Sequence, residues 1–312
     1  MDTKRIATRE SYGNALKELG AQNENIVVLD ADLAASTKTA VFQKAFPERH
    51  IDCGIAEGNM MSVAAGLAAS GKIPFASSFA MFAAGRAFEQ VRNSIGYPHL
   101  NVKIGATHAG ISVGEDGATH QCNEDIAIMR SIPGMVVINP ADDVSARAAV
   151  FAAAAYEGPV YLRFGRLGVP VIYDAATYHF EIGKAGTLRM GSDITIIATG
   201  LLVERAMQAA DLLAADGISA RVLDMHTIKP IDRESILKAA SETKGIVTAE
   251  EHSVVGGLYS AVCEVICTAN TPCKVAPVAI MDVFGTSGPA LELLEYFNLN
   301  AKTIVEKAKS LL

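Results

Sequence analysis

Residues 107–120 combine polar side chains and glycines in a pattern that suits ligand binding. The stretch reads THAGISVGEDGATH, so histidines and acids alternate with glycines. Glycine lets a backbone approach a ligand closely, and loops at the carboxyl ends of parallel strands are the usual ligand sites of α/β sheets. An ordinary polar surface loop is the alternative for this composition taken alone.

The same loop matches metal and phosphate motifs poorly. His108 and His120 are too far apart in the sequence to share one helix face, and the chain has neither an H-E-x-x-H motif nor a C-x-x-C pair. No G-K-[ST] follows the GEDG string, as a phosphate-binding P-loop would require. The sequence therefore predicts no metal site in this chain.

Glu57 is a second candidate, at the start of an apolar segment rich in small residues. The plain interpretation is an acid favoured by the dipole at a helix N-terminus. The functional interpretation is a partly buried carboxyl with a raised pKa, able to exchange a proton with a ligand.

Phe79 and Phe82 are a third candidate, at an expected strand-to-helix turn. Aromatic side chains at this spacing usually pack in a core, but they also stack on planar heterocycles.

The elements that must position these residues follow a regular alternation of β-rich and helical patterns. This alternation predicts a mainly parallel sheet covered by helices on both faces. The expected strands are 26–30, 73–79, 100–106, 135–138 and 159–164, and the expected helices are 7–20, 57–71, 80–95, 123–132 and 143–156.

Residues 170–190 interrupt this rhythm with tyrosines and turn residues and no clear helix. A second series then begins, with expected strands at 193–200, 218–225, 244–251 and 274–282. We therefore expect an α/β protein with two domains, 1–172 and 190–312, joined by a linker at 173–189.

Composition limits the partners and the compartment. The 312 residues include 27 basic and 34 acidic side chains, a net charge of −7, and no run of Lys or Arg, so neither nucleic acid nor an anionic membrane is expected as a partner. The weakly polar stretch 60–85 contains Lys72, Gly71 and Pro74, which argues against a membrane span. Five unevenly spaced cysteines predict a reduced, cytoplasmic protein.

Read in order, the motifs resemble those of transketolase, specifically its C-terminal half. They are IATR at 6–9, DADLAAS at 30–36, GIAEGNM at 54–60, SFAMF at 78–82, Thr107-His108 with GEDGATHQ at 114–121, PGMVVINPAD at 133–142, GPVYLRFGR at 158–166 and MDVFGTSGP at 281–289. The resemblance covers almost the whole chain. It implies a pyrimidine-binding domain, a transketolase C-terminal domain and dependence on thiamine diphosphate.

The resemblance also implies roles for individual residues. Glu57 would hydrogen-bond the pyrimidine ring of the cofactor and act in catalysis, with Phe79, Phe82 and Asp32 beside the cofactor. His108 and His120 would act in catalysis and, together with Asp116, bind the hydroxyls of the sugar. Arg9, Ser36 and Arg166 would bind the sugar phosphate. The implied substrate-binding set is Arg9, Ser36, His108, Asp116, His120 and Arg166.

The absence of one family motif from this sequence implies a second protein chain as partner. In the family an N-terminal domain holds the diphosphate and Mg²⁺ through a Gly-Asp-Gly segment, which this sequence lacks. The chain is therefore expected to be the C-terminal subunit of a two-chain transketolase, in an α₂β₂ assembly that transfers a two-carbon unit between pentose phosphates. Mg²⁺ would be held by the N-terminal subunit.

Two relatives and one inactive form are the alternatives. Deoxyxylulose-phosphate synthases typically have Asp-Arg in place of Thr107-His108, and the β subunit of 2-oxoacid dehydrogenase E1 lacks the GEDGATHQ string. The third alternative is a non-catalytic interaction subunit of the same fold. Gly85 stands where the family often has a Tyr, so a looser aromatic pocket is expected. Gly58 and Ala118 stand in place of the Gln and Pro expected from the family.

Overall fold

The N-terminal part of the chain forms a sheet of seven strands. The structure, a computed structural model, describes residues 4–312. The strand order is β12-β6-β7-β5-β4-β2-β3, and every pair is parallel except β12 with β6. The bounds are β2 Ile26–Asp30, β3 His50–Asp52, β4 Ile73–Phe79, β5 Lys103–Thr107, β6 Val136–Ile138, β7 Val160–Arg163 and β12 Thr227–Lys229.

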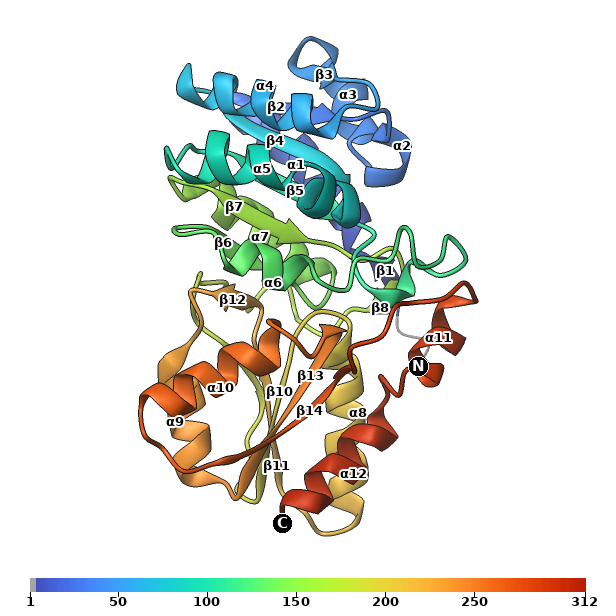
Figure 1. The fold of residues 1–312 in the computed structure, drawn as a ribbon, viewed down its shortest axis with the longest axis vertical. Helices are drawn as coiled ribbons and strands as arrows, with labels where there is room; N and C mark the ends of the chain where they lie inside the picture. Colours follow the sequence, from blue (N-terminus) through green and yellow to red (C-terminus); the bar gives the residue numbers. More distant parts are fainter. Residues whose placement is uncertain (1–3) are drawn as a thin grey trace.

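Helices cover both faces of this sheet, as its buried central strands require (Figure 1). One face packs against α1 (Thr8–Gln22), α3 (Ala40–Ala45) and α7 (Asp143–Ala155). The other packs against α4 (Glu57–Ala69) and α6 (Asp125–Arg130).

The segment expected as one helix over 80–95 is irregular. It forms two π-helical stretches, Met81–Arg86 and Val91–Gly96, on either side of the short α5, Phe88–Gln90. The wider turns of a π-helix shift the side chains that follow Phe82 away from ordinary helical spacing.

The C-terminal part forms a second sheet, in the order β14-β13-β10-β11-β9. Only β9 is antiparallel to its neighbour. Helices α8 and α12 cover one face, and α9 and α10 cover the other. The bounds are β9 Gly186–Arg189, β10 Ile194–Ala198, α8 Leu202–Ala215, β11 Ala220–Asp224, α9 Arg233–Glu242, β13 Gly245–Ser253, α10 Leu258–Thr268, β14 Lys274–Ile280, α11 Ala290–Tyr296 and α12 Ala301–Leu311.

One strand pairing joins the two parts directly. Strand β12 belongs to the second series of elements but completes the edge of the first sheet. Strand β1 (Arg5–Ala7) pairs with β8 (Gly168–Pro170), and β9 lies within the segment expected as linker. In the described residues 4–312, no helix has the length and apolar character needed to cross a membrane.

A buried carboxyl fastens the connecting segment to the second sheet. Asp224, at the end of β11, is completely buried and accepts a hydrogen bond from the hydroxyl of Tyr173 at 2.8 Å. Its other oxygen has no hydrogen-bond partner in the described part of the chain. Burial, together with the charge of Asp142, raises the pKa of Asp224 to about 7.

Asp224→Asn should flatten the pH dependence of stability. Because the folded pKa is raised, the stability contributed by Asp224 is present below about pH 4 and lost as the pH rises through 7. Between these pH values, the free energy of unfolding of the wild type should fall by on the order of 1–4 kcal/mol more than that of the variant. Urea unfolding at several pH values measures the difference, with the exposed Asp216→Asn as control. Parallel pH profiles for all three proteins would contradict it.

Candidate functional site

The candidate residues gather where the parallel strands end. Strands β2, β4 and β5 are neighbours, and Phe79 at the end of β4 lies opposite Thr107 at the end of β5. The segments that follow these strands carry Asp32 and Ser36, Phe82, and the loop 107–121. Three separate stretches of sequence therefore meet at one edge of the sheet.

His108 lies at the centre of this edge and is 3% exposed. Its backbone is left-handed, with φ of 56°, which turns the chain sharply out of β5. Its ring stacks on Phe79 with centroids 3.8 Å apart. One nitrogen, Nε2, lies 2.9 Å from Nη1 of Arg9, and the other, Nδ1, lies 2.9 Å from the hydroxyl of Thr107.

These contacts determine the protonation of His108. A guanidinium only donates, so Nε2 must accept from Arg9, and the ring proton is on Nδ1, facing Thr107. Burial first, and then the positive charges of Arg9 and Arg166, lower the pKa of His108 to about 3. The imidazole is therefore neutral at physiological pH.

Arg9 joins this histidine to the loop after β2. Its guanidinium also donates to the carbonyl oxygen of Ser36 at 2.9 Å, while its buried Nε has no hydrogen-bond partner in the described residues. Burial, followed by the charge of Arg166, lowers the pKa of Arg9. Two nearby guanidinium groups produce an electrostatic field that favours an anion.

Arg166 holds the distal part of the loop. It donates to the carbonyl of Val113 at 2.5 Å and lies 3.5 Å from the carboxylate of Asp116 and 3.7 Å from that of Glu115. Both acids are exposed, so these ion pairs are weak and free to rearrange.

His120 closes the other side of an aromatic cluster. Its ring meets Phe82 edge-on at 5.4 Å, and Phe82 lies 5.7 Å from Phe79 in a stacked orientation. Its Nδ1 is 2.9 Å from the hydroxyl of Thr119. The structure thus brings both predicted histidines and both predicted phenylalanines together.

Glu57 has a partner that the sequence interpretation did not include. The carboxylate is 2% exposed at the first residue of α4, and Arg86 donates to its two oxygens at 2.9 and 3.0 Å. The same guanidinium lies over the ring of Phe82, 4.4 Å from its centroid. The Arg86 side chain is 53% exposed, so water reaches one side of this ion pair.

Asp32 lies apart from these contacts. It is exposed and left-handed, with φ of 60°, and its amide donates to the carboxylate of Asp52. Within residues 4–312 it makes no hydrogen bond to another candidate residue.

The three departures from the family pattern have different surroundings. Gly85 faces the side chain of Met81, and Gly58 faces that of Gln90, whereas Ala118 is exposed.

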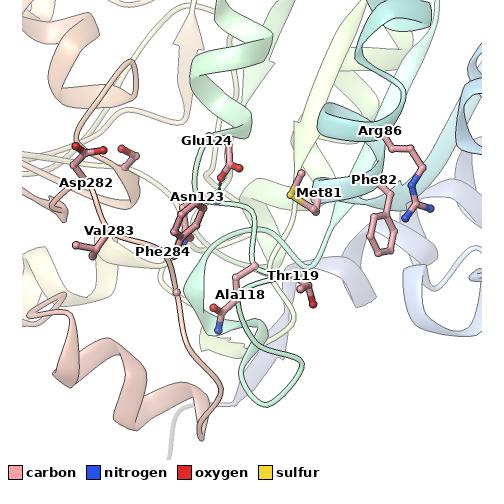
Figure 2. A pocket seen from close by; sticks show the side chains of 13 residues that line it. Met81, Phe82, Arg86, Ala118, Thr119, Asn123, Glu124, Asp282, Val283 and Phe284 are labelled. Atoms are coloured by element: carbon pink, nitrogen blue, oxygen red, sulfur yellow. Dashed lines mark hydrogen bonds between the residues drawn. The ribbon is translucent and has the colours of Figure 1, made fainter.

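A pocket of about 690 Å³ opens between the aromatic cluster and the C-terminal domain. Figure 2 shows Phe82 and Arg86 at one end, Ala118 and Thr119 beside the loop, and Phe284 on the opposite wall. Phe284 is 90% exposed. The site is therefore a wide groove with an uncovered apolar wall.

Sequence reasoning missed Arg86 and the contributions of the C-terminal domain. Arg86 follows Phe82 by four residues, and a lone cation after an aromatic pair was a usable signal. Gln121 was quoted only as part of a motif, yet its amide donates to three carbonyls, those of Ile111, Gly114 and Thr286.

Family comparisons agree with this geometry. The family model described as the transketolase pyrimidine-binding domain matches residues 4–171, and that of the transketolase C-terminal domain matches residues 183–304. The chain belongs to the transketolase family. Its mixed α/β fold, with mainly parallel sheets covered by helices, is confirmed by these matches and by solved structures.

Two relatives of similar length are named as transketolase subunits. A 6-deoxy-6-sulfo-D-fructose transketolase subunit of a Clostridium strain is 46% identical over 96% of this chain and 92% of its own length. One of the subunits of the apulose-4-phosphate transketolase of Phocaeicola vulgatus is 40% identical over 99% of this chain and 98% of its own length. A solved structure described as "Split gene transketolase, inactive beta4 tetramer" is 54% identical, with a TM-score of 0.91 and 98% of both chains covered. The chain thus corresponds to one subunit of a split transketolase-type enzyme.

This chain matches about half of the length of full-length transketolases. Transketolase from Leishmania mexicana is 27% identical, with a TM-score of 0.83. The match covers 100% of this chain and 46% of the Leishmania chain. Across residues 4–312, no cluster of three or more His, Cys, Asp or Glu is arranged to hold a metal ion.

Replacing Arg9 should make His108 easier to protonate. Arg9→Leu removes a donor to Nε2 and a nearby positive charge, so the pKa of His108 should rise from about 3 by roughly one pH unit. Burial should keep it below its ordinary value. Histidine-ring NMR titration measures this, with Arg5→Leu, whose side chain pairs with Glu204, as control. Equal pKa values in the two variants would show that Arg9 does not set the charge of His108.

Proposed function

We propose that this chain is the C-terminal subunit of a two-chain transketolase that transfers a two-carbon ketol unit from a ketose phosphate to an aldose phosphate. The observation that carries the proposal is the buried Glu57 carboxylate, which Arg86 links to the ring of Phe82, near the strand edge that holds Arg9, His108 and Arg166. The other subunit would supply the diphosphate-binding half of the site.

Arg86 supports the fit of a thiamine cofactor in this site. Its guanidinium is a planar group that donates hydrogen bonds to Glu57 and lies over the ring of Phe82. An aminopyrimidine has the same two properties, a planar face and N–H donors. Since the Arg86 side chain is half exposed, it has room to leave. Bound thiamine diphosphate would supply the carbon nucleophile and the electron sink for ketol transfer.

In this proposal Glu57 holds and exchanges the proton at the pyrimidine ring nitrogen. Glu57 is 2% exposed with Arg86 in place, and a ring that replaced this guanidinium would keep water away from the proton in the same way. Phe82, with Phe79 behind it, orients the planar ring by stacking. Asp32 is exposed near this edge and is assigned to the cofactor only by family resemblance.

The remaining side chains would hold the sugar. His120 and Asp116 would hydrogen-bond hydroxyls directly. The neutral His108 would do so where a sugar hydroxyl replaces Arg9 or Thr107 at one of its ring nitrogens. Arg9 and Arg166, with the Ser36 segment, would bind the anionic end of the substrate.

A sugar phosphate is the substrate class that we favour. The names of the two curated relatives specify a sulfonated sugar and a sugar phosphate, which are both anionic. A guanidinium recognises either anion, and pentose phosphates of the pentose phosphate pathway are our first choice. If a sulfonated ketose is preferred in competition assays, the substrate would be a sulfonated sugar and the reaction would still be ketol transfer.

The proposed assembly is an α₂β₂ hetero-oligomer in the cytoplasm. The relatives named as subunits support a separate N-terminal partner, which would also hold Mg²⁺. All five cysteines are free, as is usual in a reducing compartment.

Glu57→Gln should lower ketol transfer by a factor of about 10²–10⁴ in the assembled enzyme, because the amide cannot exchange the ring proton. Association with the N-terminal subunit should be unchanged, since the side chain is buried. A coupled assay with pentose phosphates measures turnover, and analytical ultracentrifugation measures association.

The control is Glu48→Gln, in which an exposed acid is changed in the same way. Full activity of the Glu57 variant would remove this residue from the mechanism. Loss of association would give it a structural role instead.

A further inference from the structure

Three consecutive buried titratable residues, Glu250, Glu251 and His252, stand just before the end of strand β13. Each is directed at a different element. Glu250 accepts from the amides of Leu258 and Tyr259 at the start of α10, at 2.6 and 2.8 Å. Glu250 is therefore a helix cap within the C-terminal domain.

Glu251 crosses to the other domain. Its carboxylate accepts a hydrogen bond from the backbone amide of Ser112 at 2.5 Å, 139 residues away in the sequence. Ser112 is the middle residue of the 3₁₀ turn Ile111–Val113, within the loop that carries His108 and His120. A carboxylate that accepts from a backbone amide makes a strong, charge-assisted bond.

The backbone beside this bond is shaped to admit the carboxylate. Gly110 is left-handed, with φ of 80°, and a Cβ at that position would overlap the Glu251 carboxyl group. Glycine satisfies both requirements, the positive φ and the close approach. The loop and Glu251 are thus fitted to each other in sequence as well as in geometry.

Glu251 is itself held in place by a buried ion pair. Its carbonyl oxygen accepts from Arg163 at 3.0 Å, and Arg163 pairs with Asp125 at 2.8 Å. All three side chains are at most 4% exposed.

The turn transmits this constraint to the substrate groove. The carbonyl of Val113, one residue after Ser112, accepts from Arg166 at 2.5 Å. A displaced turn would therefore release the guanidinium that faces the proposed anion site.

We propose that Glu251 is a positioning residue that fixes the turn 111–113 and, through the Val113 carbonyl, the orientation of Arg166. The C-terminal domain then sets the geometry of the anion-binding end of the groove. The assignment of that end to a sugar phosphate rests on the proposed function, whereas the effect on the loop does not.

Hydrogen–deuterium exchange of the purified chain tests the first step. Glu251→Ala should accelerate exchange in peptides covering 109–114 at least tenfold, because the Ser112 amide loses its acceptor. Glu251→Gln, which keeps an acceptor oxygen of the same length, should restore most of the protection. Glu251→Asp, which is shorter but still charged, replaces the alanine variant if that variant does not fold.

Glu250→Ala is the matched control, an equally buried acid one residue earlier. It should accelerate exchange at the start of α10 and leave peptides 109–114 unchanged. Equal loop exchange in the Glu250 and Glu251 variants, or no change in either, would overturn the proposal.

Kinetics in the assembled enzyme tests the second step. Glu251→Ala should raise KM for a ketose phosphate at least fivefold and leave kcat within twofold, with no such split for Glu250→Ala. A fall in kcat at constant KM would overturn the link to Arg166. If the wild-type assembly transfers no ketol unit, the proposed function fails, and the exchange experiment still decides the role of Glu251.

Discussion

The buried ion pair between Arg163 and Asp125 is the interaction on which the site depends most. It lies where β7, α6 and the end of β13 meet, and Arg163 also donates to the carbonyls of Cys122 and Glu251. Tyr161 donates to the same Asp125 oxygen. Removing one partner of such a buried pair typically costs about 3–5 kcal/mol, since the other charge is left uncompensated. One charged cluster thus fixes the loop, the first domain and the second domain to one another.

This arrangement explains why the chain presents an ordered but open site. Glu251 and Arg166 hold loop 107–121 from outside, and Gln121 holds it from within. Apart from Arg86, which must leave Glu57, the side chains that face the groove are already placed, so their ordering would cost little entropy on binding. The exposed Phe284 and the half-exposed Arg86 mark the side that remains uncovered. In the proposed assembly that side receives the N-terminal subunit and the cofactor.

The sequence predicted the elements whose signals are local. The apolar runs 26–30 and 73–79 form β2 and β4 with the expected bounds, because buried parallel strands are continuous apolar segments. The family resemblance implied that Phe79, Phe82, His108 and His120 lie in one site. The structure brings them together because the carboxyl ends of neighbouring strands meet at one edge.

Features that depend on distant partners were not predictable in this way. Strand β12 has three residues, too few for a periodic pattern, and pairs with β6 about ninety residues earlier. The Arg86–Glu57 pair joins residues 29 apart, and the Glu251–Ser112 bond joins residues 139 apart. Nothing in local composition distinguishes Glu251 from the helix-capping Glu250 beside it.

The most direct test of the central claim, that this chain supplies one half of a shared site, is a calorimetric titration with thiamine diphosphate and Mg²⁺. It compares the isolated chain, the isolated N-terminal subunit and their equimolar mixture. We predict tight, stoichiometric binding in the mixture and at least tenfold weaker binding to either chain alone. Binding by the isolated chain as tight as by the mixture would contradict it.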